Sequence, residues 1–342
     1  MDLSITIASY NSCQVTLRTL QSIYSETQGV EYEIIVVDNA STDGSADMIA
    51  EKFPKVRLIR SRRNLGFAAA HNKALALASG KYLMILNSDV LFLNNPAWQM
   101  LCRLRNAGEK VGVLGPQILN PDGTFAPSAR KRIIYSRFLV ALTIINQTIP
   151  FIQFFPVDFA RRYFGRILGR VHDKFSPPSS AQEVEWVDGM CVMFKREVLE
   201  QTGLFDEQYF FDFEIGDLLM RVSSKGWRIL FDPYVRIIHL GGYSRKRMSR
   251  ILLESQRSEL IYYAKYRPDY IPMLRRINVL RYWFELMSMR VKSLFFPKSA
   301  SWHMRSDILS EALNLVLEFK PSSVLQHEHI PYLADQFDRN SQ

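Results

Sequence analysis

The chain has 342 residues, of which 47% are hydrophobic and 12% aromatic, so it can bury a sizeable core and does not have a disordered composition. Its formal net charge of +9 favours an anionic partner, such as a phosphorylated substrate or an anionic lipid surface. Nucleic acid is disfavoured because the chain has no zinc finger, RNP-like stretch or glycine-rich basic tail.

The cysteines and the first residues predict a cytoplasmic protein. Cys13, Cys102 and Cys191 form no Cys-x-x-Cys pair, so neither a disulfide framework nor a thiolate zinc site is expected. Residues 1–7 lack the basic region and the long apolar run of a signal peptide, and they are typical of a first strand.

The first 115 residues alternate short β-branched runs with helical patterns. The predicted strands are Leu3–Ile7, Glu33–Val37, Val56–Ile59, Tyr82–Leu86 and Val111–Leu114. Such alternation indicates an α/β fold with a doubly wound, mostly parallel sheet.

From residue 116 to residue 178 the periodicity fails, which predicts a basic and aromatic insertion that contacts the acceptor, with a membrane-lying or disordered loop as the alternative. Regular patterns then return. Strands are expected at Glu183–Val187, Val192–Phe194, Arg228–Phe231 and Val235–Ile238, and a helix at Phe213–Lys225. The chain therefore divides into segments 1–115, 116–178, 179–248 and 249–342.

The segment from residue 249 is helical in pattern. Its apolar stripe comprises Met273, Ile277, Leu280, Phe284, Met287, Val291 and Leu294. With Trp283 and several arginines outside the stripe, it fits an amphipathic helix on an anionic membrane surface, or a helix docked on the catalytic core. The most apolar region, residues 133–155, is too interrupted by polar residues to span a bilayer.

Polar residues follow three of the predicted strands, at 8–11, 38–43 and 87–89. Ligands bind beyond the carboxyl ends of parallel strands, so this rim predicts a ligand site, although an ordinary turn could explain any one of the three. The chain has neither a dinucleotide-binding glycine motif nor a P-loop. A divalent cation, Mg²⁺ or Mn²⁺, held by acidic residues is then the expected way to neutralise a diphosphate.

Several short motifs of the chain match those of a known family and occur in the same order. They are Ile7–Asn11, Ile34–Ser45, Asn64–Asn72, Leu86–Asp89, Trp186–Gly189, Gly203–Glu207, Gly226–Trp227 and Ile238–Gly242. Over residues 3–242 the chain resembles the inverting family 2 glycosyltransferases of the GT-A fold, in their rhamnosyltransferase-like branch.

The resemblance implies a nucleoside-diphosphate-sugar donor. The implied donor contacts are Ser9, Tyr10, Asn11, Asp38, Asn39, Asn64, Gly66, Asn72, Asn87 and Trp186. Asp38 and Asn39 would bind the base or ribose, since a carboxylate accepts from the imide N–H of uracil or thymine. Trp186 would stack on a sugar face, or belong to the core.

The resemblance also implies a metal site. Asp89 would be the metal-binding end of the Asp-x-Asp motif, in which Asn87 replaces the first aspartate. His239 would be a second ligand, with a purely structural histidine as the alternative. The cation would act as a Lewis acid on the leaving diphosphate.

The catalytic base is where the chain departs from its relatives, because Ile215 stands at the usual aspartate position. Asp188 is expected near the substrate. Glu214 is the predicted base, Asp217 is a second candidate that can instead hold Arg221, and Asp212 is a third. A protein that has lost its base is the remaining alternative.

The predicted activity is metal-dependent transfer of a sugar, with rhamnose from dTDP-rhamnose as the best guess, to a lipid-linked or polysaccharide acceptor. This would serve O-antigen or cell-wall synthesis, with the protein peripheral on the inner face of the cell membrane. The alternatives are a UDP-hexose donor and a catalytically impaired nucleotide-sugar-binding protein. A nucleotidyltransferase is disfavoured because the chain has no glycine-rich, lysine-containing loop after the first strand. The oligomeric state stays open.

Overall fold

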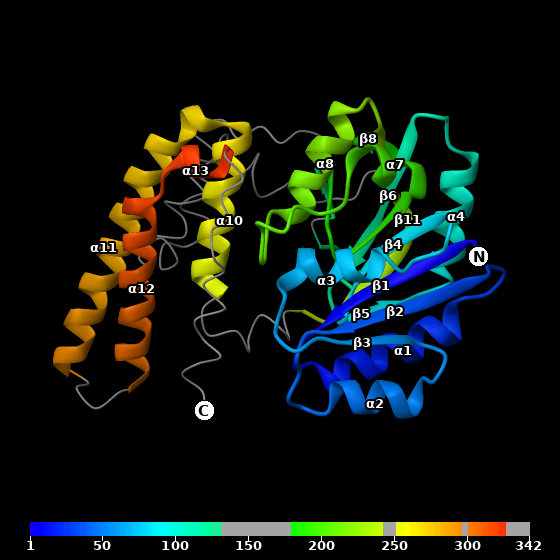
Figure 1. Ribbon diagram of the computed structural model, residues 1–342, viewed down its shortest axis with the longest axis horizontal. Coiled ribbons are helices and arrows are strands. Elements are labelled where there is room, and N and C mark those ends of the chain that lie inside the picture. Colours follow the sequence, from blue (N-terminus) through cyan, green and yellow to red (C-terminus); the bar gives the residue numbers. More distant parts are fainter. Residues whose placement is uncertain (127, 131–178, 242–250, 296–299, 326–342) are drawn as a thin grey trace. The chain divides into compact units, whose positions relative to one another are not determined.

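The computed structural model describes residues 1–126, 128–130, 179–241, 251–295 and 300–325 (Figure 1). The chain divides into two compact units. The first holds Met1–Ile133 and Phe175–Ser249, and the second holds Ile134–Lys174 and Arg250–Gln342. Most of the insertion that is predicted to contact the acceptor, from residue 131 to residue 178, is not among the described residues.

Nine strands of the described part of the first unit form one mixed sheet, in the order β3-β2-β1-β4-β10-β6-β11-β5, with β8 paired to β11. Its strands are β1 (Leu3–Ser9), β2 (Tyr32–Asp38), β3 (Arg57–Arg60), β4 (Tyr82–Asn87), β5 (Val90–Phe92), β6 (Val111–Leu119), β8 (Gln182–Val184), β10 (Cys191–Lys195) and β11 (Arg228–His239). Strands β1 to β4 are parallel to one another, and β6 is parallel to β11. Strand β10 is antiparallel to both β4 and β6 and so joins the two parallel sets.

Helices cover both faces of this sheet. Helices α1 (Cys13–Glu26), α2 (Ser45–Lys52) and α4 (Pro96–Asn106) share one apolar cluster with Ile34 and Val36 of β2. Helix α3 (Gly66–Leu75) packs against Ile35 and Val37, the alternate residues of the same strand. Helices α7 (Arg196–Thr202) and α8 (Glu214–Ser224) share a third cluster with β4 and β10. Because successive side chains of a strand point to opposite faces, β2 is apolar at Ile34–Val37, and the predicted α/β fold with a doubly wound, mostly parallel sheet is confirmed.

Three strand predictions needed correction. Strand β6 is buried along its whole length and continues to Leu119, because it pairs with β11 beyond the predicted end at Leu114. The two predicted closing strands are one strand, β11, whose register shifts between Asp232 and Arg236. The predicted strand at Glu183–Val187 is two strands, because β8 pairs with β11 whereas β9 (Trp186–Val187) pairs with β7 (Ala129–Arg130).

The described part of the second unit is helical, as predicted. It contains α10 (Ile251–Tyr266), a 3₁₀ turn η2 (Pro268–Tyr270), α11 (Ile271–Phe295), α12 (Ala300–Glu318) and α13 (Pro321–Leu325). None of the described helices is long and apolar enough to cross a membrane.

The face that α11 buries is not the predicted apolar stripe. It buries Leu274, Asn278 and Tyr282, and the Tyr282 hydroxyl donates to Gln256 of α10. Arg275 donates to the carbonyls of Val316 and Phe319 at the end of α12. The buried face of α11 is therefore the one that forms hydrogen bonds with α10 and with the end of α12. The large apolar side chains Leu280, Trp283 and Phe284 are 58%, 50% and 55% exposed.

Candidate active site

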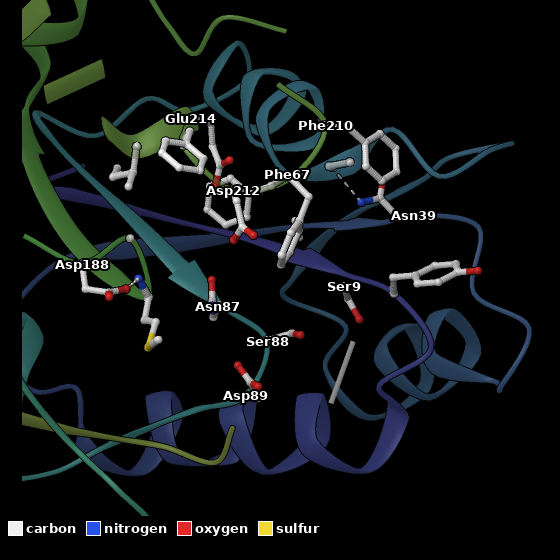
Figure 2. A pocket seen from close by; sticks show the side chains of 18 of the residues that line it. Ser9, Asn39, Phe67, Asn87, Ser88, Asp89, Asp188, Phe210, Asp212 and Glu214 are labelled. Carbon is white, nitrogen blue, oxygen red and sulfur yellow. Dashed lines mark hydrogen bonds between the residues drawn. The ribbon is translucent and has the colours of Figure 1, made fainter. Parts of the chain in front are cut away.

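A pocket of about 430 Å³ opens at the carboxyl ends of β1 and β4 (Figure 2). The residues predicted to form the site that line it are Ser9, Tyr10, Asn39, Asn64, Gly66, Asn87, Asp89, Trp186, Asp188, Glu214 and His239. The register explains the convergence, because Ser9 pairs with Asp38 and Ala8 pairs with Asn87 in neighbouring parallel strands. The three polar strand ends therefore meet at one edge of the sheet, as the sequence predicts.

Buried hydroxyl groups join the end of β1 to the predicted metal-binding motif after β4. Ser9 Oγ lies 3.1 Å from Ser12 Oγ, which lies 3.3 Å from Ser88 Oγ. Thr19 of α1 donates to the Ser88 carbonyl over 2.9 Å. These contacts fix the turn between β4 and β5 against α1, so the neighbouring Asp89 has a defined position.

Asp38 is not among the residues that line the pocket, although its strand partner Ser9 and its neighbour Asn39 are. Its side chain is 2% exposed, and Oδ2 accepts the Ser41 N–H over 3.0 Å. Its buried Oδ1 atom has no hydrogen-bond partner among the residues that the structure describes. A buried acceptor without a donor costs free energy, so Oδ1 would gain from a ligand N–H. Beside it, the Asn39 amide donates to the Gly66 carbonyl over 3.1 Å.

Gly66 makes room for another part of the chain. Its φ is +77°, and a Cβ there would lie 2.3 Å from the Phe210 carbonyl oxygen. The Phe67 N–H donates to that same carbonyl over 2.8 Å. Gly66 thus seats residues 209–213 on the start of α3, while Asn64 Oδ1 accepts the Gly66 N–H.

Asn11 and Asn72, both predicted to contact the donor, do not line the pocket. Asn11 Oδ1 accepts the Thr42 N–H over 2.8 Å and ties the first two strand ends together. Asn72 bonds both backbone groups of Phe205, donating over 2.9 Å and accepting over 3.0 Å. Both side chains hold loops that surround the pocket.

Asp89 and His239 meet, as the predicted metal site requires. Their Oδ1 and Nε2 atoms are 3.2 Å apart, because β5 pairs with β11 so that Val90 lies opposite His239. The described residues contain no group of three or more His, Cys, Asp or Glu side chains that could hold a metal. A carboxylate and an imidazole leave coordination positions open for diphosphate oxygens, which suits a cation bound together with its substrate.

The opposite wall is acidic. Asp188, Asp212 and Glu214 all line the pocket, and Figure 2 shows the Asp212 carboxylate directed into it, toward Asn87. Glu214 is 7% exposed, and burial, reinforced by the charges of Asp212 and Asp188, raises the pKa of its carboxyl to about 8. Glu214 is therefore mostly protonated at neutral pH.

Asp217 lies outside this wall. It is 1% exposed, and its Oδ2 accepts from Arg221 Nε over 2.9 Å, which confirms the predicted alternative that it holds Arg221. Arg221 in turn donates to the carbonyls of Thr202 and Leu204, each over 2.7 Å. This network fixes the segment before α8.

Ile215, at the usual position of the base, forms an apolar wall of the pocket. It is 6% exposed and packs so closely on Gly189 that a Cβ there would lie 3.3 Å from the Ile215 side chain.

The phenylalanines that line the pocket were not identified from the sequence. Phe67, Phe210 and Phe211 all face the pocket. The signal that could have found them is the aromatic run of residues 209–213, directly before the predicted helix.

The fold and this pocket, with a carboxylate and a histidine on one side and carboxylates on the other, define an enzyme of the glycosyltransferase class. Residues 4–171 match the family described as Glycosyl transferase family 2.

The chain is similar to a rhamnosyltransferase, which confirms the predicted branch. It is 28% identical over 225 residues to the N-acetylglucosaminyl-diphospho-decaprenol L-rhamnosyltransferase of Mycobacterium tuberculosis, covering 63% of this chain and 68% of that protein. It is 27% identical over 259 residues to the O-antigen biosynthesis protein RfbC of Myxococcus xanthus, covering 74% of this chain and 18% of that protein. The solved mannosyltransferase PcManGT from Pyrobaculum calidifontis, in complex with GDP-Man and Mn²⁺, superposes with a TM-score of 0.47 at 19% identity, covering 94% of this chain and 86% of that one.

Proposed function

We propose that the chain transfers rhamnose from a nucleoside-diphosphate donor, with inversion at the anomeric carbon, to a lipid-linked or polysaccharide acceptor in cell-surface glycan synthesis. The observation that carries this proposal is the pocket, which has the Asp89 and His239 pair on one side and three carboxyl groups on the other. The name of the Mycobacterium tuberculosis relative supports the choice of rhamnose and of a polyprenyl-diphosphate acceptor.

The donor base fits at the first two strand ends. The buried Asp38 Oδ1 atom would accept the imide N–H of thymine or uracil, which would satisfy the unpartnered acceptor. Ser9 and Tyr10 line the adjoining part of the pocket and would contact the ribose and diphosphate.

Asp89 and His239 would hold the divalent cation, Mg²⁺ or Mn²⁺. The cation would supply Lewis acidity that neutralises the leaving diphosphate. Their 3.2 Å separation is compatible with two ligands on one ion, since both donor atoms already converge.

The sugars would lie between the aromatic and the acidic walls. Trp186 and Phe210 offer apolar faces on which a sugar ring can stack. Asp188 is held in place, because its own N–H donates to the Ser128 carbonyl and its Oδ1 accepts the Met190 N–H. It would hydrogen-bond a sugar hydroxyl.

Donor binding is the first test. The thermal unfolding midpoint of the purified chain would be measured with Mn²⁺ and dTDP-rhamnose, UDP-glucose or GDP-mannose, because a ligand that binds the folded state raises it. We expect dTDP-rhamnose to give the largest shift and to support transfer to an N-acetylglucosaminyl-diphospho-polyprenol acceptor. A larger shift with UDP-glucose would refute the rhamnose assignment, and binding without transfer or hydrolysis would favour an impaired binding protein.

We further propose that the second unit meets an anionic membrane surface at the inner face of the cell membrane. Leu280, Trp283 and Phe284 are at least half exposed on α11. Arg276 and Arg290 are also exposed, and their spacing of four and seven residues from these side chains puts them on the same side of the helix. Apolar insertion flanked by basic residues is how interfacial helices bind anionic lipids.

A further inference from the structure

An inverting transfer needs a group that takes the proton of the attacking hydroxyl, and Ile215 cannot supply it. Among the residues that the structure describes, four carboxyl groups line the pocket, namely those of Asp89, Asp188, Asp212 and Glu214. Asp89, Asp188 and Glu214 are poorly suited to accept that proton. The Asp89 carboxylate is paired with His239, and the Asp188 carboxylate already accepts the Met190 N–H.

Glu214, the base that the sequence favours, has the wrong protonation state. Its carboxyl is buried beside Asp212 and Asp188, and its Oε2 atom has no hydrogen-bond partner within the described part of the chain. With a pKa near 8 it already carries a proton at neutral pH, so it cannot accept another. When Glu214 is protonated, it adds no third negative charge beside Asp188 and Asp212.

Asp212 has the better geometry. It is half-buried, and its carboxylate points into the pocket toward Asn87 (Figure 2), whereas Glu214 is buried. Asp212 stands in the chain between Phe211 and Phe213, and all three residues line the pocket.

The backbone that directs Asp212 is strained and firmly held. Asp212 and Phe213 have φ values of +63° and +66°, a left-handed conformation that is costly for a non-glycine residue. The segment is held at three points. Phe67 bonds the Phe210 carbonyl, Asn72 bonds Phe205, and the Tyr209 hydroxyl lies 3.4 Å from Asp217. Strain that the surroundings enforce in this way is concentrated at functional sites.

We propose that Asp212 is the general base of the transfer, and that Glu214 is a positioning residue beside it. The proposal rests on the proposed function. The acceptor hydroxyl oxygen forms a bond to the anomeric carbon while the bond from that carbon to the diphosphate oxygen breaks. The electron pair of that bond leaves with the nucleoside diphosphate, and the hydroxyl proton passes to the Asp212 carboxylate, which later releases it to water.

The test compares Asp212→Asn, Glu214→Gln and the control Glu207→Gln in the full chain, with dTDP-rhamnose, Mn²⁺ and an N-acetylglucosaminyl-diphospho-polyprenol acceptor. Asparagine tolerates positive φ, so Asp212→Asn keeps the backbone while removing the base. Glu207 lies in the same segment outside the pocket, and glutamine there keeps an oxygen to accept from Asn72.

We expect Asp212→Asn to lower kcat by about 10²- to 10⁴-fold while the donor-induced thermal shift is unchanged. Wild-type activity should fall above about pH 8, where Glu214 loses its proton. Glu214→Gln, which resembles the protonated acid, should lower kcat by less than about tenfold and should not show this fall. Glu207→Gln should behave as wild type.

Wild-type turnover by Asp212→Asn, or a loss in Glu214→Gln as large as that expected for Asp212→Asn, would overturn the base assignment alone. A wild-type chain that binds no nucleotide sugar and transfers none would refute the proposed function and, with it, this assignment.

Discussion

Replacing Gly66 with alanine would test whether the segment at residues 209–213 is seated on α3 as the structure indicates. Gly66 has a φ of +77°, and the added Cβ would lie 2.3 Å from the Phe210 carbonyl oxygen, a backbone atom that no rotamer change can move. Gly44 is a matched control, because its φ is +81° and nothing lies within 4 Å of a Cβ built there.

The two substitutions share one cost and differ in another. Alanine at a left-handed φ costs about 1–2 kcal/mol, and this is all that Gly44→Ala should lose. Gly66→Ala should lose about 2–4 kcal/mol more, from overpacking and from disruption of the bond between the Phe67 N–H and the Phe210 carbonyl. It should also displace Asp212, and a shift of about 1 Å can lower turnover about 10²-fold.

Urea unfolding of both variants at one pH, together with the transfer assay, checks this reasoning. We expect Gly66→Ala to be the less stable variant and to lose turnover, whereas Gly44→Ala stays active. Equal unfolding free energies and equal activities would show that the close approach at Gly66 does not hold the loop.

Three further predictions follow from the site and from α11. Asp89→Ala should abolish transfer and the Mn²⁺-dependent part of donor binding, measured by calorimetry, with an unchanged unfolding midpoint, and normal activity would refute the metal site. Because the pKa of Glu214 is raised from 4.5 to about 8 in the folded protein, Glu214 contributes its full stabilisation below about pH 4.5 and loses it as the pH rises through about 8. The unfolding free energy of the wild type should therefore fall over that pH range, and that of Glu214→Gln should not show this fall. The double variant Leu280→Ser with Phe284→Ser should weaken sedimentation with anionic liposomes, whereas Leu317→Ser, which alters another exposed apolar side chain, should not, and equal binding would contradict the proposed membrane face.

The sequence by itself determined the α/β layering and the rim of the site. Both depend on local patterns, because a strand covered on both faces must be apolar throughout, as Ile34 to Val37 are. Polar residues directly after such strands must then meet at one edge of a parallel sheet, which is why Ser9, Asn39 and Asn87 could be placed in one pocket.

Only the tertiary structure decided which of the polar residues face the ligand and in what protonation state. Asn72 and Asp217 have the residue types of a site, but partners distant in sequence, or one turn away on α8, direct their side chains to loop carbonyls and to Arg221. The meeting of Asp89 with His239 depends on the pairing of β5 with β11, and the raised pKa of Glu214 depends on burial. These properties arise from side-chain packing between remote segments, and no local sequence pattern encodes the desolvation and the neighbouring charges that set them.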